Sequence, residues 1–403
     1  MPTTPGLAPS TAHMERGGAR VKVTPALSAY LDFMRFTAAQ LVLWSHLGQE
    51  RYTMGWVGPF GGLGHEAVVV FFVLSGFIIH ASTVDRGSGA LDYAVARASR
   101  IYSVALPAVV FSVGLSAALA VWAPAVRQVA SFREFSWADM AGSLLFWNNS
   151  WSAWREGSFW STFLTLNVPY WSLCYEVWYY VFFGLFLFLR GSGRWVAMVL
   201  ALLVAGPGIV ALFPIWCLGA WLSARRGTLP RWSKGVALSV FLGSLAVVGG
   251  IDASGVDQAI KDTLHEHVPG FWRLGAAQFL VTDYVLGLAV VANIHAFGFL
   301  ADPVKDFFAR RRALLANLAG FSFTLYLFHR PILIASVVLM GDPPASNGVS
   351  MAAAVLVTAL CWAISFATER QLPRWRRALL RLVGRSPGFK GGAAAAAASP
   401  RQR

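Results

Sequence analysis

Two ionisable side chains share one face of the first apolar segment of this sequence. Arg35 and His46 lie eleven residues apart, about three helical turns, so they are separated by about 16 Å along the helix axis. Histidine can take a proton from a hydroxyl group, and arginine can bind a phosphate. The structural alternative is that Asp32 pairs with Arg35 at i,i+3 to orient the helix and that His46 is an interface residue.

A second pair of basic residues, Arg97 and Arg100, precedes Tyr102 at the expected start of the third apolar segment. Two guanidinium groups spaced i,i+3 at a helix start form a fork that suits phosphates. The commoner role of arginines at such a border is to anchor the helix at the membrane surface. In the second segment, Ser75 and Gly76 form a small patch where another helix can approach, so packing is the preferred role of Ser75.

The fourth apolar segment places a carboxylate inside the hydrophobic region. It opens with Pro169-Tyr-Trp171-Ser172, and Glu176 lies about two turns, roughly 10 Å, from its outer edge. A carboxylate at that depth needs a partner or a water-filled cavity. Ser172, Tyr179 and Tyr180 share its face, so a hydroxyl group could satisfy it.

The ninth segment holds His329, Arg330 and Pro331 near its middle. Proline frees a backbone carbonyl at this depth and predicts a broken helix, as at many membrane sites. Asp283, in the eighth segment, is the expected counter-ion of Arg330.

The composition predicts that membrane helices position these residues. Of the 403 residues, 56% are hydrophobic and 13% are charged, whereas soluble proteins have about 25% charged residues. A bilayer-spanning helix needs about 20 apolar residues. The sequence therefore predicts an all-α, polytopic integral membrane protein with about ten spans, at residues 26–48, 66–84, 101–122, 169–190, 194–206, 209–224, 234–252, 274–298, 314–340 and 349–370.

The distribution of basic residues predicts the orientation. Gly206-Pro207-Gly208 is a strong turn signal, and splitting the chain there places most of the 33 lysines and arginines on one side. Both termini are then cytoplasmic. We expect a disordered N-terminus at 1–23, a membrane domain at 24–372 and a basic, disordered tail at 373–403. The outer loop 123–168 is rich in tryptophan, and its apolar stretch 137–147 predicts a short interfacial or re-entrant helix.

Other kinds of site are not expected. The positive charge follows the topology, so it does not indicate nucleic-acid binding. The three cysteines are far apart in sequence and suggest neither a zinc cluster nor a disulfide. Residues 62–67 have the spacing GxGxxA but follow a helix rather than a strand, which argues against a dinucleotide site. We therefore predict no metal and no permanently bound cofactor.

Taken together and in order, these motifs closely resemble bacterial acyltransferase family 3, the membrane-bound O-acyltransferases that modify envelope glycans and some secondary metabolites. The resemblance covers about residues 24–372. It differs at Ser103, because the family usually has a proline soon after the Arg-Ile-Tyr motif, and here the proline comes at Pro107. The matching motifs are Asp32-x2-Arg35-x10-His46, Phe71-Phe-Val-Leu-Ser75-Gly76-Phe77, Arg97-x2-Arg100-Ile-Tyr102, Trp171-Ser172-x3-Glu176 and Tyr326-x2-His329-x-Pro331.

The resemblance implies a stand-alone, multi-pass enzyme of the bacterial inner (plasma) membrane. Its donor substrate would be acyl-CoA, usually acetyl-CoA, offered from the cytoplasm, and its acceptor a hydroxyl group of a glycan or glycolipid near the outer side. The partners are thus acyl-CoA, the acceptor and the lipid bilayer. The expected residues are His46 and Glu176 for catalysis; Arg35, Arg97, Arg100 and Tyr102 for donor binding; and Asp32, Ser75, Trp171, Ser172, Asp283, His329 and Arg330 in support.

Two other classes of protein fit part of this pattern. A transporter or flippase of a lipid-linked glycan would also have about ten spans and buried charges, but transporters commonly show internal repeats and none is visible here. A non-catalytic scaffold would not need so many ionisable residues in lipid. The acceptor, the acyl chain, a direct or an acyl-enzyme route, and the oligomeric state stay open.

Overall fold

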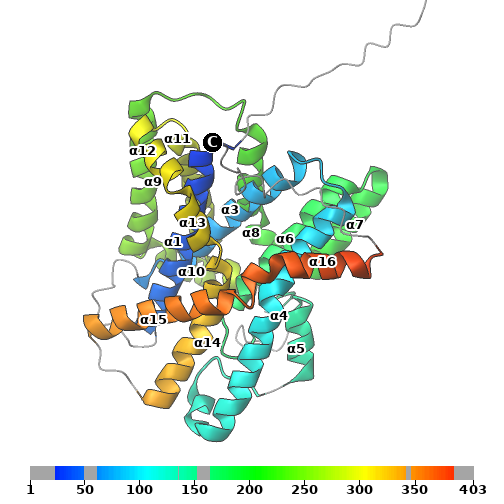
Figure 1. Cartoon of the computed structure of the whole chain (residues 1–403), viewed down its shortest axis with the longest axis vertical. Helices are drawn as coiled ribbons and strands as arrows, with labels where there is room; N and C mark the ends of the chain where they lie inside the picture. Colours follow the sequence, from blue (N-terminus) through cyan, green and yellow to red (C-terminus); the bar gives the residue numbers. More distant parts are fainter. Residues whose placement is uncertain (1–22, 50–60, 135, 152–163, 342–345, 385–403) are drawn as a thin grey trace, which may run out of the picture.

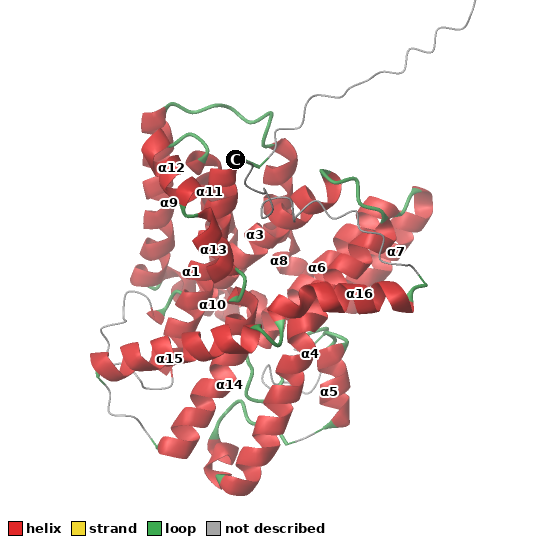
Figure 2. Cartoon of the chain, viewed as in Figure 1, coloured by secondary structure: helices red, strands yellow, loops and turns green. Residues whose placement is uncertain are grey.

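The computed structural model describes residues 23–49, 61–134, 136–151, 164–341 and 346–384. Within these ranges the regular elements are helices and no strand occurs, as predicted (Figures 1 and 2). The helices are α1 (Pro25–Gln49), α3 (Gly64–Val84), α4 (Ala90–Trp122), η1 (Pro124–Gln128), α5 (Trp137–Leu144), α6 (Tyr170–Phe188), α7 (Gly191–Ala205), α8 (Pro207–Arg225), α9 (Lys234–Ser254), α10 (Val256–His267), η4 (Phe271–Phe279), α11 (Leu280–Phe297), α12 (Asp302–Arg310), α13 (Arg312–Ala319), α14 (Ser322–Met340), α15 (Asn347–Ser365), η5 (Glu369–Gln371) and α16 (Leu372–Leu382).

The protein is an all-α, multi-pass membrane protein. In the described part of the chain, eight helical segments are long and apolar enough to cross a bilayer; they contain α3, α4, α6, α8, α9, α11, α14 and α15. The predicted first and fifth spans also form helices but do not belong to this set. Helix α1 has 25 residues and carries Asp32 and Arg35, and α7 has only 15 residues.

Several helix boundaries differ from those predicted. Helix α4 begins at Ala90 rather than near 101, so Arg97 and Arg100 lie inside a 33-residue helix instead of at its start. The predicted span 314–340 is divided at Gly320 between α13 and α14. The C-terminal tail was expected to be disordered from 373, but α16 extends to Leu382 with an alternation of basic and apolar residues typical of an amphipathic helix.

Pro331 does not break its helix, contrary to the prediction. Helix α14 runs through it without interruption. Pro331 has no backbone N–H, so the carbonyl oxygen of Leu327 loses its usual helical hydrogen bond. The side-chain amide of Asn167 donates to this oxygen instead, at 2.8 Å. Continuity is possible because a neighbouring side chain satisfies the freed carbonyl.

Glycines set the closest helix contact in the core, between α3 and α8. A Cβ atom on Gly76 would lie 2.0 Å from the carbonyl oxygen of Trp216, and one on Gly219 would lie 1.9 Å from that of Val73. Only residues without a side chain allow such an approach. The small patch at Gly76 therefore packs against another helix, as predicted, and fixes α3 beside α8.

The turn between α7 and α8 lies where the sequence placed it. Gly206 has φ 89°, a conformation that favours glycine, and Pro207 occupies the first turn of α8. At the other end of α8, Arg226 forms an ion pair with Asp85, which follows the last residue of α3. This contact joins the C-terminal ends of α3 and α8, which the predicted topology puts on the same side of the membrane.

The short helix expected in the outer loop is present as α5. Its first turn is capped by Ser136, whose hydroxyl accepts from the backbone N–H of Asp139 at 3.3 Å, and Trp137 is 72% exposed. Residues 1–22 of the predicted disordered N-terminus 1–23 lie outside the described residues, as do residues 152–163 of the outer loop 123–168 and the tail beyond 384.

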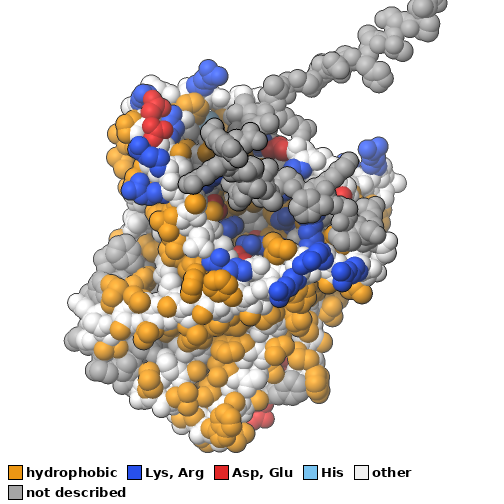
Figure 3. Space-filling model, in the orientation of Figure 1, with side chains coloured by type: hydrophobic (Ala, Val, Ile, Leu, Met, Phe, Trp, Pro, Cys, Tyr) orange, Lys and Arg blue, Asp and Glu red, His pale blue; other side chains and the backbone are white. Residues whose placement is uncertain are grey.

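The surface agrees with a protein surrounded by lipid. Figure 3 shows hydrophobic side chains gathered over the lower part of this face, where α4, α14 and α15 lie, and basic side chains in a band above them, near α16. Apolar residues of α15 such as Val355 and Leu356 are 57% and 68% exposed. Such exposure of contiguous apolar surface is expected for lipid-facing helices.

Candidate active site

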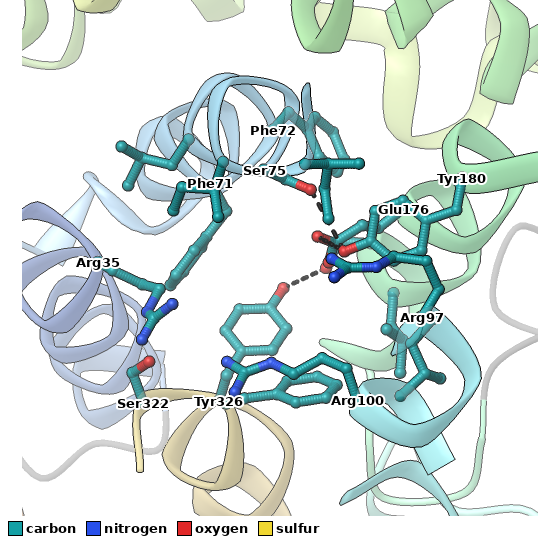
Figure 4. A pocket seen from close by; sticks show the side chains of 17 residues that line it. Arg35, Phe71, Phe72, Ser75, Arg97, Arg100, Glu176, Tyr180, Ser322 and Tyr326 are labelled. Carbon is teal, nitrogen blue, oxygen red and sulfur yellow. Dashed lines mark hydrogen bonds between the residues drawn. The ribbon is translucent and has the colours of Figure 1, made fainter. Parts of the chain in front are cut away.

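Five helices surround one cavity of about 120 Å³ (Figure 4). The polar side chains that point into it come from α1, α3, α4, α6 and α14, and the wall between them is apolar. The cavity thus joins residues that are spread over the whole sequence. Its polar lining residues are Arg35, Ser75, Arg97, Arg100, Ser172, Glu176, Tyr180, Ser322 and Tyr326.

Three arginines predicted to bind the donor meet in this cavity. Arg35 of α1 donates to the carbonyl oxygen of Ala319 at 2.9 Å and lies 3.7 Å from Asp32. Arg97 and Arg100 extend from one face of α4, which their i,i+3 spacing dictates. Figure 4 shows the three guanidinium groups on different sides of the same space. Three of the basic side chains therefore lie around an internal cavity rather than on the outer surface.

Arg35 and Arg97 each have a buried hydrogen-bond donor without a partner among the described residues. Arg97 lies over the ring of Tyr180, with its Cζ 5.9 Å from the ring centroid. The Nε atoms of Arg35 and Arg97 are buried and have no hydrogen-bond partner among the described residues. Buried donors of this kind are rare unless a ligand or water meets them, so the cavity suits an anionic ligand such as a phosphate.

Glu369 completes the environment of Arg100, and the sequence interpretation missed it. One of its carboxylate oxygens lies 2.8 Å from Nη2 of Arg100, and the other accepts from the backbone N–H groups of Phe323 and Thr324, each at 3.2 Å. Those N–H groups belong to the first turn of α14, which attracts anions. An ionisable residue at the end of the predicted tenth span was the available signal.

Glu176 belongs to the cavity with the arginines. Its Oε1 accepts from the hydroxyl of Tyr180 at 2.5 Å, and Tyr180 in turn lies 3.3 Å from the hydroxyl of Ser75. The indole N–H of Trp216 donates to Ser75 at 3.1 Å. The expectation that a tyrosine hydroxyl satisfies Glu176 is confirmed, and Ser75 has a polar contact inside the cavity as well as a place in the helix packing.

A second hydroxyl pair closes the cavity between α6 and α14. The hydroxyl groups of Ser172 and Tyr326 lie 2.6 Å apart, and Tyr326 also donates to the carbonyl oxygen of Pro169 at 3.2 Å. These bonds connect the start of α6 to α14 across the cavity. Tyr326 belongs to the motif Tyr326-x2-His329-x-Pro331, but the sequence did not indicate its contact with Ser172.

His46 contacts His329 and Arg330 of the predicted ninth span. Nη1 of Arg330 donates to Nδ1 of His46, and the ring of His329 is stacked on that of His46 with centroids 5.2 Å apart. Because a guanidinium group can only donate, neutral His46 carries its proton on Nε2 in this arrangement. His46 is not among the residues that line the cavity.

Asp283 is not the counter-ion of Arg330, contrary to the prediction. Its carboxylate is fully buried and bonds to Nε2 of His65 at 2.7 Å. The two helix starts that carry Asp283 and His65 are in contact, whereas Arg330 faces α1. The sequence alone does not distinguish an Asp283–Arg330 pair from an Asp283–His65 pair. His65 lies in the GxGxxA stretch 62–67, outside the predicted set of site residues.

Three further predicted site residues do not line the cavity. Tyr102 does not line the cavity; its hydroxyl donates to the carbonyl oxygen of Leu144 at 2.9 Å and so connects α4 to α5. Trp171 stands beside His65, with nearly parallel rings whose centroids are 6.4 Å apart. His329 bonds to the carbonyl oxygen of Leu325 within its own helix. Within the part of the chain described here, no group of three or more histidines, cysteines or carboxylates could hold a metal ion.

Comparison with known proteins adds one finding. The family model described as an acyltransferase domain, that of acyltransferase family 3, matches residues 28–368, which include every residue that lines the cavity. No curated protein and no solved structure matches the chain.

Proposed function

This chain belongs to acyltransferase family 3, and from that membership we propose that it transfers an acyl group, in the simplest case acetyl, from cytoplasmic acyl-CoA to a hydroxyl group of an envelope glycan or glycolipid. Its membership makes the protein a membrane acyltransferase. The donor, the acceptor and a place in the bacterial inner membrane are the content of the proposal.

The observation that supports acyl-CoA as the donor is the arginine cavity. Coenzyme A carries a diphosphate and a further phosphate, and guanidinium groups bind phosphates with short, charge-assisted hydrogen bonds. Arg35, Arg97 and Arg100 supply three such groups, and two of their Nε atoms have no partner in the described structure. The apolar wall, which includes Phe71 and Phe72, suits the narrow pantetheine arm.

The reaction needs a group that accepts a proton. The acceptor oxygen attacks the thioester carbonyl carbon, so a C–O bond forms, the C–S bond breaks, and coenzyme A leaves as a thiol after taking up a proton. His46 stays the proposed general base. Since its Nδ1 accepts from Arg330, proton transfer to this nitrogen requires the two side chains to separate during the reaction. Glu176, inside the cavity, is the next candidate.

The orientation of the helices supports a cytoplasmic donor. The predicted topology puts the beginnings of α4 and α14 and the end of α15 on the inner side. Ser322 begins α14, Glu369 lies in η5 just after α15, and Arg100, about three turns into α4, meets Glu369 beside the cavity. The carboxylate of Glu369, held between Arg100 and the first turn of α14, indicates that this end of the cavity attracts anions.

A direct experiment is to incubate the purified full chain with radiolabelled acetyl-CoA and the envelope glycan fraction of its own cells. We expect saturable binding of acetyl-CoA and transfer of label to the glycan as an alkali-labile ester. Absence of acetyl-CoA binding would contradict the proposed donor. If the protein instead moves a lipid-linked glycan across the membrane of reconstituted vesicles and no ester forms on it, the transporter alternative is favoured.

A further inference from the structure

Three helices begin next to one another beyond one end of the arginine cavity. These first turns, of α3, α6 and α11, carry His65, Trp171 and Asp283. The ring of Trp171 is 15° from parallel to that of His65, and the ring of Phe279 also packs against His65 with centroids 4.9 Å apart. The side chain of His65 is 26% exposed, so the cluster is open to a ligand.

Two carboxylates in this cluster each have an oxygen atom without a hydrogen-bond partner among the described residues. They are Oδ2 of Asp283, which is fully buried, and Oε2 of Glu66, whose residue is 5% exposed. Such atoms are uncommon because leaving a buried polar group unpaired is unfavourable. A carboxylate oxygen accepts hydrogen bonds, so a ligand group that donates one would satisfy it.

The charges select against an anionic ligand. The groups that act electrostatically on His65 are the carboxylates of Asp283, Glu66 and Asp257, which come from α11, α3 and α10. Three carboxylates around one imidazole make this cluster less favourable for a phosphate than the arginine cavity. Hydroxyl groups have the required donors without charge, and flat rings such as Trp171 pack against the apolar faces of sugars.

The cluster is connected to the cavity through aromatic packing. Trp171 packs edge-on against Phe72 with centroids 6.3 Å apart, and both Phe72 and Ser172 line the cavity. On α3 the cavity wall extends from Phe71 to Ile79. His65 precedes Phe72 by seven residues, about 10 Å along the helix, so a ligand at the cluster would lie beyond one end of that wall.

We propose that His65, Glu66, Trp171 and Asp283 form the binding site for the hydroxyl groups of a neutral, polyhydroxylated acceptor such as a sugar unit. The proposal rests on the acyltransferase function proposed above and adds to it the place where the acceptor enters. Asp283 acts as a positioning residue, because its buried carboxylate holds the His65 ring.

The test compares acceptor and donor kinetics in the detergent-solubilised full chain. The envelope glycan fraction of its own cells is added in graded amounts at saturating radiolabelled acetyl-CoA. His65→Gln and Glu66→Gln should each raise the KM for this fraction about ten- to hundredfold, because each loses hydrogen bonds to the ligand. The kcat and the binding of acetyl-CoA should stay within about threefold of wild type.

Asp283→Asn should behave in the same way, and His65→Gln keeps the proposal testable if burial makes the Asp283 variant unstable. His80→Gln is the matched control, since it applies the same substitution to a half-buried histidine of the same helix, near the other end, where Nδ1 meets Ser223 at 3.1 Å. This control should leave the KM for the glycan fraction and the KM for acetyl-CoA unchanged.

The outcomes separate this inference from the function on which it rests. An unchanged KM for the glycan fraction in His65→Gln and Glu66→Gln would overturn the acceptor site while leaving the transferase intact. A fall in kcat alone would also overturn it and would assign the cluster to the chemical step. Wild-type protein that binds acetyl-CoA but leaves the glycan unlabelled would contradict the proposed acceptor class, and absence of acetyl-CoA binding would contradict the proposed function itself.

Discussion

The carboxylate of Glu369 lies between the guanidinium group of Arg100 and the first turn of α14. Its side chain is 2% exposed, and the distance between Oε1 and Nη2 of Arg100 is 2.8 Å. The two residues are separated by most of the chain, so this contact fixes η5, which follows α15, against α4 and α14. It also holds one of the three cavity arginines in place.

Removal of either partner should destabilise the protein, and removal of both should cost less than the sum. Arg100→Ala leaves a buried carboxylate without its cation, and Glu369→Gln removes the charge but keeps one acceptor for the backbone N–H groups. Hydrogen bonds to charged groups contribute about 1.5–3 kcal/mol. Thermal unfolding of the two single variants and the double variant gives their coupling energy. Strict additivity would show that the contact is absent in solution.

Loss of a cavity arginine should weaken donor binding. Arg97→Ala removes a guanidinium group whose Nε has no partner among the described residues, and a charge-assisted bond to phosphate contributes about 1.5–3 kcal/mol. We expect about a ten- to hundredfold loss in affinity for labelled acetyl-CoA. Arg97→Lys should recover part of it, because lysine keeps the charge but not the planar fork.

Exposed Arg86 provides the control for that experiment. Arg86→Ala should bind acetyl-CoA like wild type. Equal affinities of Arg97→Ala and Arg86→Ala would mean that Arg97 only anchors α4 at the membrane surface.

His46 should affect transfer without affecting donor binding. It lies outside the arginine cavity and contacts Arg330 and His329. If it accepts the hydroxyl proton, His46→Ala should lower kcat by about 10²–10⁴. Single-turnover transfer and equilibrium binding of acetyl-CoA measure the two effects separately. A variant that keeps more than about a tenth of wild-type turnover would rule out this role and leave Glu176 or His329 as candidates.

The contact between α3 and α8 should not tolerate a side chain at Gly219. A Cβ atom there would lie 1.9 Å from the carbonyl oxygen of Val73, whereas one on Gly243 of α9 would meet nothing within 4 Å. Gly219→Ala should therefore reduce the yield of folded protein and its melting temperature. Gly243→Ala should be neutral or stabilising by about 0.4–1 kcal/mol, since alanine favours helix. Similar melting temperatures for both variants would contradict the close approach.

The sequence was sufficient to predict the kind of protein and most of its helices. Runs of apolar residues are local, and a bilayer requires each run to satisfy its own backbone hydrogen bonds, so spans such as 66–84 and 169–190 correspond closely to α3 and α6. The i,i+3 spacing of Arg97 and Arg100 likewise placed both on one face of α4. The turn at Gly206 was predictable because its conformation favours glycine.

Only the tertiary structure decided which polar side chains pair. Asp283 bonds to His65, 218 residues away in sequence, rather than to Arg330, and Arg330 meets His46 instead. Such pairings depend on how each helix is rotated and which neighbour it contacts, and helical periodicity within one segment carries no information about either. Glu176 therefore lies in the cavity with the arginines and not beside His46. Glu369 contacts Arg100 and the first turn of α14. The sequence supplied the charged groups, and packing between the helices assigned their partners.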